Sequence, residues 1–220
     1  MSTYILLSGF DKDGFYDTVA KELKSVITDT KNILFVASNP DNFEKIDNYT
    51  PRIFGFFNKI GVNFNSYSVL DKRMPDGEQK KAVESASCVF LMGGETLTQL
   101  EYLKQQNLIE PLMKHDGVII GLSAGAINMG KRSVIANPAY PPVKIFDGIG
   151  LVDITAVPHF GEITEDYIKT EIFPLTYDGT IYGMYDNAVF TVRDGIIKYS
   201  GTIYKLNKGN MKLLPDLKEK

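Results

Sequence analysis

The stretch VIIGLSAGAINMG, residues 118–130, decides the fold of this chain. An apolar run leads into Gly-Leu-Ser-Ala-Gly, and small residues follow. A G-x-S-x-G segment between a strand and a helix is the nucleophile-elbow pattern, in which a sharp turn exposes the serine hydroxyl. Gly121 and Gly125 would keep Cβ atoms away from the crowded backbone of this turn. The pattern predicts that Ser123 is a nucleophile; the alternative is a small residue in a glycine-rich turn that joins a strand to a helix.

Short apolar segments alternate with amphipathic segments along the first half of the chain. We predict strands at 4–10, 32–38, 63–70, 88–94 and 118–123. We predict helices at 15–27, 41–60, 78–86, 95–106 and 108–115. Strands that are apolar throughout and separated by helices are typical of a parallel sheet covered on both faces. Because crossovers between parallel strands are right-handed, the pattern predicts a doubly wound α/β fold with a mostly parallel sheet flanked by helices.

The C-terminal quarter has a different pattern. Residues 188–206 contain Asp194-Gly195 between two β-rich runs, which is a strong signal of a hairpin. We therefore expect antiparallel hairpin strands attached to the same sheet, as an extension at about 188–214. With 220 residues, 44% of them hydrophobic, and no repeat or linker, the chain fits a single domain over 1–220.

The charge and composition of the chain exclude several classes of partner. Its formal net charge is -3 and no block of Lys and Arg occurs, so we expect no nucleic-acid or membrane surface. The N-terminus lacks the features of a signal peptide, and the apolar runs are too short to span a bilayer. Cys88 is the only cysteine and lies in an apolar run, which indicates a small buried hydrophobe. These observations predict a cytoplasmic protein.

Only two histidines are present to act as the general base that a serine nucleophile needs. His159 follows a largely apolar run, where a strand would end, and its intrinsic pKa suits a base at neutral pH. His115 lies at the end of a predicted helix, where a basic residue complements the helix dipole. The pairing with Ser123 favours His159 as the base; the alternative is a histidine that is hydrogen-bonded in the core.

A carboxylate must orient the imidazole, and the chain offers many. The candidates are Asp147, Asp153, Glu162, Glu165, Asp166, Glu171, Asp178, Asp186 and Asp194. Asp194 belongs to the predicted hairpin turn, and Glu165 with Asp166 is typical of a solvated helix start. We prefer Asp186, which stands at the end of an apolar strand; the alternative is an aspartate that forms a turn before Asn187.

Gly93 and Gly94 end another predicted strand, and a helix follows them. Glycines in this place leave backbone N–H groups open, and one of these, with the N–H of Ala124, could form an oxyanion hole. The alternative is a phosphate-binding loop, but G-x-G-x-x-G is absent and no Walker lysine follows. Two isolated histidines without H-E-x-x-H argue against a metal site, so we expect no cofactor.

The segments FLMGGETLTQL, IIGLSAGAINMG and VPHF, in this order and spacing, resemble the peptidase E group of serine peptidases. These enzymes are relatives of cyanophycinase and have the class I glutamine amidotransferase-like (flavodoxin-like) fold. The resemblance extends from residue 4 to about residue 206. It implies that Ser123 is the nucleophile, that His159 is the base, and that the glycine pair with Ala124 forms the oxyanion hole.

The resemblance also bears on the third member of the triad. In cyanophycinase-like members, a Glu in a Gly-x-Asp-Glu-Asn-Thr-Ala-like segment completes the triad. Residues 183–188 resemble that segment, and Asp186 stands where the Glu would stand. Peptidase E itself places an Asp shortly after the elbow, but no acid occurs at 124–146 of this chain.

The activity that the resemblance implies is hydrolysis of short peptides through an acyl-enzyme, with dipeptides that begin with aspartate as one substrate class. Such substrates need positive charge nearby, for which Lys131 and Arg132 after the elbow and Lys169 are candidates. Glu95 and Thr96, next to the glycine pair, are further candidate substrate contacts. The alternatives are a cyanophycinase-like isopeptide hydrolase and a non-catalytic homologue that binds a small metabolite. Family members are monomers or homodimers, and both states remain open here.

Overall fold

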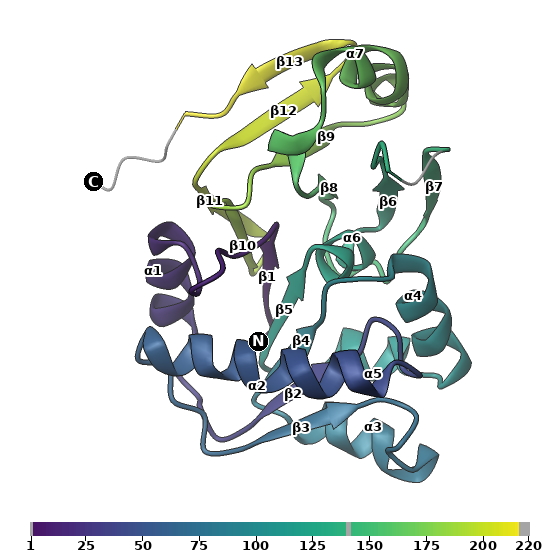
Figure 1. The fold of residues 1–220 in the computed structure, drawn as a ribbon. Helices are drawn as coiled ribbons and strands as arrows, with labels where there is room; N and C mark the ends of the chain where they lie inside the picture. The colour runs from purple at the N-terminus through teal and green to yellow at the C-terminus, as the bar shows by residue number, and fades with distance from the viewer. Residues whose placement is uncertain (1, 140–141, 216–220) are drawn as a thin grey trace.

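A computed structural model of the chain describes residues 2–139 and 142–215. A seven-stranded sheet forms the centre of the molecule (Figure 1). Its strands are β1 (Thr3–Leu7), β2 (Ile33–Val36), β3 (Tyr67–Leu70), β4 (Cys88–Leu91), β5 (Val118–Leu122), β10 (Val189–Arg193) and β11 (Ile196–Ser200). They lie in the order β11-β10-β1-β5-β4-β2-β3. The five strands β1, β5, β4, β2 and β3 are parallel to one another. β10 pairs antiparallel with β1, and β11 pairs antiparallel with β10. The predicted mostly parallel sheet is confirmed.

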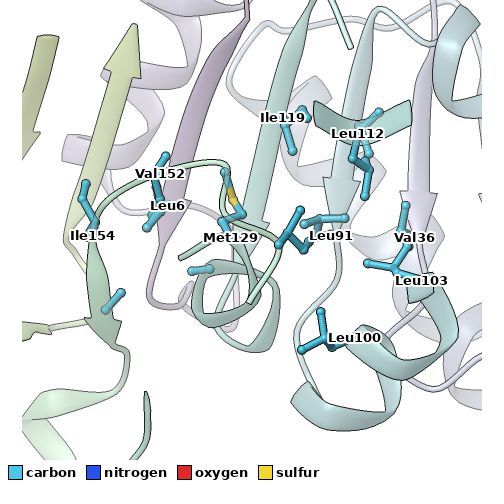
Figure 2. Close-up of a cluster of buried hydrophobic side chains, with 14 of the residues drawn as sticks. Leu6, Val36, Leu91, Leu100, Leu103, Leu112, Ile119, Met129, Val152 and Ile154 are labelled. Carbon is cyan, nitrogen blue, oxygen red and sulfur yellow. The ribbon is translucent and has the colours of Figure 1, made fainter. Parts of the chain in front are cut away.

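Helices cover both faces of this sheet. One face carries α1 (Asp17–Val26) and α2 (Phe43–Lys59); the other carries α3 (Asp76–Ser85), α4 (Thr96–Gln105), α5 (Ile109–Lys114) and α6 (Ala124–Met129). The buried side chains form one hydrophobic cluster on each face, the first under α1 and α2 and the second under α3 to α6. Successive residues of a strand point to opposite faces, so Ile5 and Leu7 pack in the first cluster and Leu6 packs in the second. Figure 2 shows the second cluster, which includes Leu6 of β1 and Met129 of α6. The doubly wound arrangement follows from this two-sided burial.

The limits of most elements lie close to those predicted. α2 begins after Asn42, whose side-chain oxygen accepts a hydrogen bond from the Lys45 N–H at 3.2 Å. The strand predicted at 63–70 is shorter, because only its second half pairs with β2. None of the described helices combines the length and the apolar character that a membrane span requires.

The predicted hairpin at Asp194-Gly195 is present, but the strands beyond it do not join the main sheet. The two turn residues have φ values of 52° and 74°, as a two-residue type I′ turn between β10 and β11 requires. A second sheet has the order β13-β12-β9-β8 and consists of β8 (Thr155–Val157), β9 (Ile181–Met184), β12 (Ile203–Asn207) and β13 (Asn210–Leu213). The chain changes sheets at Gly201, where φ is +82° and a Cβ would lie 2.2 Å from the Asn187 carbonyl oxygen. The expectation that the C-terminal strands join the main sheet is therefore confirmed for β10 and β11 and wrong for β12 and β13.

Smaller elements connect the two sheets. β6 (Arg132–Ile135) pairs with β7 (Lys144–Asp147) in a two-stranded sheet. The segment between β8 and β9 contains the short helical turns η1 (Phe160–Glu162), α7 (Glu165–Tyr167), η2 (Ile168–Ile172) and η3 (Phe173–Tyr177). In Figure 1 the second sheet lies above the carboxyl ends of β1 and β5. Turns that leave the second sheet therefore face turns that leave the main sheet.

Candidate active site

Ser123 lies in the turn between β5 and α6, at the carboxyl end of the parallel strands. Its φ of 49° and ψ of -103° form a conformation that residues other than glycine rarely adopt. The Ser123 N–H donates a hydrogen bond to the Leu7 carbonyl oxygen at 2.8 Å, which ties the turn to β1. The side chain is partly exposed, so the hydroxyl is accessible from the carboxyl edge of the sheet.

The two glycines of the elbow make this turn possible. A Cβ on Gly125 would lie 2.2 Å from the Leu91 carbonyl oxygen, which belongs to a rigid strand. A Cβ on Gly121 would lie 2.5 Å from the Met129 sulfur atom. Both positions therefore exclude any side chain, and the backbone has the geometry of a nucleophile elbow.

The imidazole of His159 reaches the Ser123 hydroxyl from the second sheet. Its Nε2 lies 2.9 Å from the Ser123 Oγ, although 36 positions separate the two residues. His159 directly follows the loop after β8 and has a left-handed backbone, with φ 54° and ψ 31°. The structure thus places His159 near a strand end, but this strand belongs to the second sheet rather than to the main one.

Asp186 lies on the other side of the His159 ring, where its Oδ1 is 2.8 Å from Nδ1. It occupies a turn between β9 and β10, which the Ala188 N–H closes by donating to the Tyr185 carbonyl oxygen at 2.8 Å. A carboxylate only accepts hydrogen bonds, so Nδ1 carries the ring proton and Nε2 is left as an acceptor for Ser123. None of the other candidate carboxylates, all of which lie in the described residues, pairs with the ring.

Pairing shifts the pKa of both groups. The hydrogen bond with Asp186, helped by the charges of Asp186 and Glu162, raises the pKa of His159, and burial opposes this rise. For Asp186, burial acts to raise the pKa, but hydrogen bonds from His159 and Ser8 and the charge of His159 outweigh it and hold the pKa below its ordinary value. Asp186 is therefore ionised at neutral pH, where it stabilises an imidazolium.

The register of the main sheet brings a further serine, Ser8, to this place. In β1, Leu7 lies opposite Leu122 of β5 on one side and opposite Val189 of β10 on the other. Ser8 is the next residue, so it stands between the elbow and the turn that carries the acid. The motifs did not single it out, although its place at a strand end is a signal that could have found it.

Ser8 is fully buried and links His159 to Asp186. Its Oγ accepts a hydrogen bond from the His159 N–H at 2.8 Å. The same hydroxyl lies 2.9 Å from Asp186 Oδ1 and 3.0 Å from the Met184 carbonyl oxygen, the two acceptors for its proton. The neighbouring Gly9 leaves room for the acid, since a Cβ there would lie 2.5 Å from the Asp186 Cγ.

Comparison with known proteins agrees with this geometry. Residues 4–199 match the model of peptidase family S51. The chain belongs to this family. It is a serine-type peptidase.

Several relatives of this S51 peptidase carry the name peptidase E. Peptidase E of Escherichia coli O6:K15:H31 (strain 536 / UPEC) is 27% identical over 180 residues, which cover 74% of this chain and 75% of the relative. Peptidase E of Escherichia coli strain K12 / DH10B gives the same values.

Two solved structures share its fold. A peptidase from an acI-B1 Actinobacterium superimposes with a TM-score of 0.73 at 15% identity, over 99% of this chain and 96% of that one. A Listeria monocytogenes EGD-e protein, described as a candidate peptidase E, gives a TM-score of 0.66 at 19% identity, over 91% and 98% of the two chains.

Gly93 lies beside the serine of this S51 peptidase, and Gly94 follows it in the loop after β4. A Cβ on Gly93 would lie 3.4 Å from the Ser123 Cβ. Gly94 has a φ of +134°, which favours glycine. None of the backbone hydrogen bonds that join the described loops and turns uses the N–H of Gly93, Gly94 or Ala124 as its donor.

A pocket of about 340 Å³ opens in front of Ser123 and His159. The ends of β1, β2, β4 and β5 and the first turns of α2 contribute its walls. Lys45 of α2 lines it, although the motifs did not point to this residue. The signal available was its place in a helix predicted to begin just after a strand end, at the edge where ligands bind.

Three of the predicted substrate contacts lie outside this lining. Lys131 and Arg132 follow α6, which has 6 residues and leads the chain away from Ser123 by about 9 Å. The Arg132 guanidinium donates to the Leu175 carbonyl oxygen at 3.1 Å. Lys169 pairs with Glu165 at 3.3 Å on an exposed surface. The placement does not support a role for these three residues in substrate binding.

The other two predicted contacts, Glu95 and Thr96, also lie outside the lining. Glu95 accepts a hydrogen bond from the Asn39 side-chain amide at 2.7 Å, so it supports a residue of the pocket without facing the pocket itself. Thr96 is buried, and its carbonyl oxygen accepts from the Asn128 side-chain amide at 2.9 Å. These contacts are structural.

The only group of three potential metal ligands among the described residues is His159, Glu162 and Asp186, with ligand atoms within 4.8 Å of one another. Two of them already share the proton between Nδ1 and Oδ1 described above. Glu162 is exposed and pairs with neither side chain. The geometry fits a hydrogen-bonded acid–base pair.

Two buried titratable residues lie apart from the site. His115 is 3% exposed at the end of α5, and burial lowers its pKa, so the ring is neutral. The prediction that His115 lies at a helix end is confirmed, whereas its burial disfavours the charged form that would complement the helix dipole. Cys88 is fully buried, as predicted, and burial raises the pKa of its thiol.

Proposed function

We propose that this S51 peptidase hydrolyses short peptides through an acyl-enzyme, with Ser123 as nucleophile, His159 as general base and Asp186 as the orienting acid. The Ser123 Oγ attacks the carbonyl carbon of the scissile bond while His159 Nε2 takes its proton. The imidazolium gives this proton to the leaving amine, so the C–N bond breaks and the acyl group remains on the serine oxygen. Water then attacks the acyl-enzyme ester while the His159 ring takes its proton, and the ring returns this proton to the Ser123 Oγ. This step releases the acyl group as a carboxylic acid and restores Ser123.

The observation that carries this proposal is the continuous chain of hydrogen bonds from Ser123 to Asp186. The two distances, 2.9 Å and 2.8 Å, lie within the range of about 2.6–3.2 Å that proton transfer needs. The ionised Asp186 favours the tautomer in which Nε2 accepts. A homologue that only binds a metabolite does not require this alignment, so the geometry favours an enzyme.

Backbone N–H groups complete the proposed machinery. The oxyanion of the tetrahedral intermediate would accept hydrogen bonds from Ala124 and from Gly93 or Gly94. Ala124 is the first residue of α6, where an N–H has no partner within the helix. Gly93 supports this role because it lies against Ser123, where a Cβ on Gly93 would be 3.4 Å from the Ser123 Cβ.

The size of the pocket supports short substrates. Its volume of about 340 Å³ is near the lower end of the range of about 300–1,000 Å³ that is typical of small-ligand pockets. Dipeptides that begin with aspartate are the first class to test, because the sequence resembles peptidase E. A cyanophycinase-like isopeptide hydrolase would use the same machinery and would differ in the occupant of the pocket.

A panel of dipeptides with Asp, Glu or a neutral residue in first place, together with an isopeptide, tests the proposal. We expect Ser123→Ala to lower kcat by at least ~10³-fold, because the members of a triad act as a unit. Ser25→Ala is the matched control: Ser25 is exposed on α1 and its hydroxyl donates to the Glu22 carbonyl oxygen, so the activity of this variant should equal that of the wild type. Equal activity in Ser123→Ala and the wild type would contradict the assignment.

A fluorophosphonate probe makes the test independent of the choice of substrate, because it forms a covalent bond with an activated serine. Mass spectrometry should find the probe on Ser123 in the wild type and nowhere in Ser123→Ala. A wild-type protein that stays unlabelled and cleaves no member of the panel would support the non-catalytic alternative.

A further inference from the structure

A second cavity, of about 390 Å³, adjoins His159 and Asp186 but not Ser123. The His159 ring stands between this space and the pocket in front of Ser123, because it lines both. Its Nε2 faces Ser123 and its Nδ1 faces Asp186. We call this space the rear cavity; its walls include Tyr16, His159, Glu162, Tyr185 and Asp186. The proposed hydrolysis makes no use of it.

Two carboxylates give the rear cavity a negative charge. Asp186 and the exposed Glu162 line it, and none of the described residues around it is Lys or Arg. The hydrogen bonds that described residues donate to the Asp186 carboxylate both go to Oδ1, from His159 Nδ1 at 2.8 Å and from Ser8 Oγ at 2.9 Å. Its Oδ2 therefore keeps both lone pairs for a further partner. Such a space attracts a cation.

Three residues of the rear cavity place potential metal ligands close together. One ligand atom each of His159, Glu162 and Asp186 lies within 4.8 Å of the other two. The ligands of a tetrahedral zinc ion are roughly 3.4 Å apart, because each lies about 2.0–2.2 Å from the metal. Rotation of the exposed Glu162 side chain can close the difference. An imidazole nitrogen with carboxylate oxygens suits zinc, and water can take the fourth position.

Two short turns hold these ligands in place. Glu162 ends the turn η1, in which its N–H donates to the His159 carbonyl oxygen at 3.0 Å. Gly161 of the same turn packs against Tyr185, since a Cβ there would lie 2.8 Å from the ring carbon Cε1. Asp186 directly follows Tyr185, so the turn of the base and the turn of the acid are packed against each other. The ligands therefore come together without any change of the fold.

We propose that a zinc ion binds in the rear cavity to His159 Nδ1, Asp186 and Glu162, and that it inhibits the peptidase by disabling the base. The inhibition rests on the proposed function, in which His159 Nε2 takes the Ser123 proton. Zinc takes the lone pair of Nδ1, so the single proton of the neutral ring moves from Nδ1 to Nε2. Nε2 then donates to the Ser123 Oγ instead of accepting from it. The ring loses no proton, so removal of the zinc restores the active tautomer.

Inhibition by zinc chloride tests the site on the dipeptide that the wild type cleaves fastest, with each variant compared with its own rate without zinc. Glu162→Gln keeps the shape of the side chain and removes its charge. The zinc concentration that halves activity should rise at least about 10-fold in this variant, because even the loss of a residue that only supports a metal ligand lowers metal affinity by about 10- to 100-fold. EDTA should restore the activity of the wild type. Mg²⁺ should not inhibit at the same concentrations, since it prefers oxygen ligands.

Glu165→Gln is the matched control for the change of charge. Glu165 is an exposed carboxylate that pairs with Lys169 at 3.3 Å and lies outside the rear cavity. Zinc should inhibit this variant at the same concentration as the wild type. Equal inhibition of Glu162→Gln and the wild type would overturn the inference.

Binding without turnover separates a failure of this inference from a failure of the proposed function. Zinc chloride is titrated by calorimetry into the Ser123→Ala protein, with and without Glu162→Gln, and the double variant should bind at least about 10-fold more weakly. Nitrogen NMR of the imidazoles should show that zinc moves the ring proton of His159 from Nδ1 to Nε2, while the signals of the buried His115 stay unchanged. These results would support the site even if the wild type cleaved no peptide. Equal affinity in the two proteins, or unchanged His159 signals, would refute it even if Ser123 proved to be the nucleophile.

Discussion

Ser123 is held by a regular strand-turn-helix unit of the main sheet, whereas His159 and Asp186 lie in turns that directly follow strands of the second sheet. In the first region, the backbone and the absence of side chains set the geometry. The Ser123 N–H is bonded to β1, and no Cβ fits at Gly121 or Gly125. In the second region, side-chain hydrogen bonds set the geometry, and the buried Ser8 hydroxyl is their centre.

This difference separates two kinds of tolerance. Packing around the elbow admits no extra atom, so changes there should affect folding together with activity. Hydrogen bonds around His159 and Asp186 can be removed without adding atoms, so changes there should affect the pKa and the orientation of the base while the fold remains. Three substitutions test this distinction, in order of decreasing effect.

Gly125→Ala should have the largest effect, because it acts on the fold. The added Cβ would lie 2.2 Å from the carbonyl oxygen of Leu91, which strand pairing holds in place. We expect a loss of about 3 kcal/mol or more in the free energy of unfolding, at or beyond the upper end of typical overpacking costs. Urea denaturation monitored by circular dichroism measures this loss of stability.

Gly55→Ala is the matched control for this substitution. Gly55 lies inside α2, and a Cβ there would meet no atom within 4 Å. Alanine in a helix interior should stabilise the protein by about 0.5–1 kcal/mol. If the two alanine variants had the same stability, the elbow would not depend on the missing side chain.

Asp186→Asn should leave the fold intact and lower kcat by about 10²- to 10⁴-fold, because the neutral amide no longer enforces the productive tautomer. The pH profile should change as well. Asp186 raises the pKa of His159, so in the wild type the neutral base is lost as the pH falls through a value above about 6.5. Without the carboxylate this pKa falls, and the acidic limb of kcat/KM moves to lower pH.

Asp194→Asn provides the control for the change of charge, since Asp194 lies in the hairpin turn, where asparagine is also favoured. It should leave both kcat and the profile unchanged. An acidic limb at the same pH in Asp186→Asn and the wild type would show that another group sets the pKa of His159.

Ser8→Ala should have the smallest of the three effects, a loss of about 3- to 30-fold in kcat, because it removes one hydrogen bond on the acid and one on the backbone of the base. Looser pairing between Asp186 and His159 should move the acidic limb in the same direction as in Asp186→Asn, but less far. Kinetics as a function of pH provide the measurement.

Ser133→Ala separates a positioning role of Ser8 from a merely structural one. Ser133 is equally buried and donates a hydrogen bond to the Ile127 carbonyl oxygen at 2.6 Å. Ser133→Ala removes this hydrogen bond and should lower the stability of the fold by about as much as Ser8→Ala does, but without any shift in the pH profile. If both serine variants had the wild-type profile, Ser8 would serve folding alone.

Local patterns in the sequence were enough to predict the main sheet and the elbow. Apolar strands alternate with helices, and Gly-Leu-Ser-Ala-Gly places Ser123 at a strand end, because these features depend on residues close together in the chain. The Asp194-Gly195 hairpin is local in the same sense. Such signals fail where pairing is between distant segments: nothing near β12 indicates that it pairs with β9 rather than with β11.

The missed residues of the site have the same origin. Lys45 and Ser8 come to the pocket through sheet order, which no short motif encodes. Lys131 and Arg132 were assigned to the pocket because they lie near Ser123 in the chain. The short α6 instead carries them away from it. Distance along the chain was a poor measure of distance in space at this point.

The carboxylate of Asp186 occupies the space that a side chain at position 9 would fill, since a Cβ on Gly9 would lie 2.5 Å from its Cγ. The two positions are 177 residues apart in the chain, yet they exclude each other's alternatives. A side chain at position 9 and a carboxylate at position 186 would occupy the same space, so we expect a homologous chain with a larger residue shortly after its first strand to lack a carboxylate in the place of Asp186. The identity of this one residue should therefore indicate, from sequence alone, whether such a chain can place a carboxylate beside its histidine.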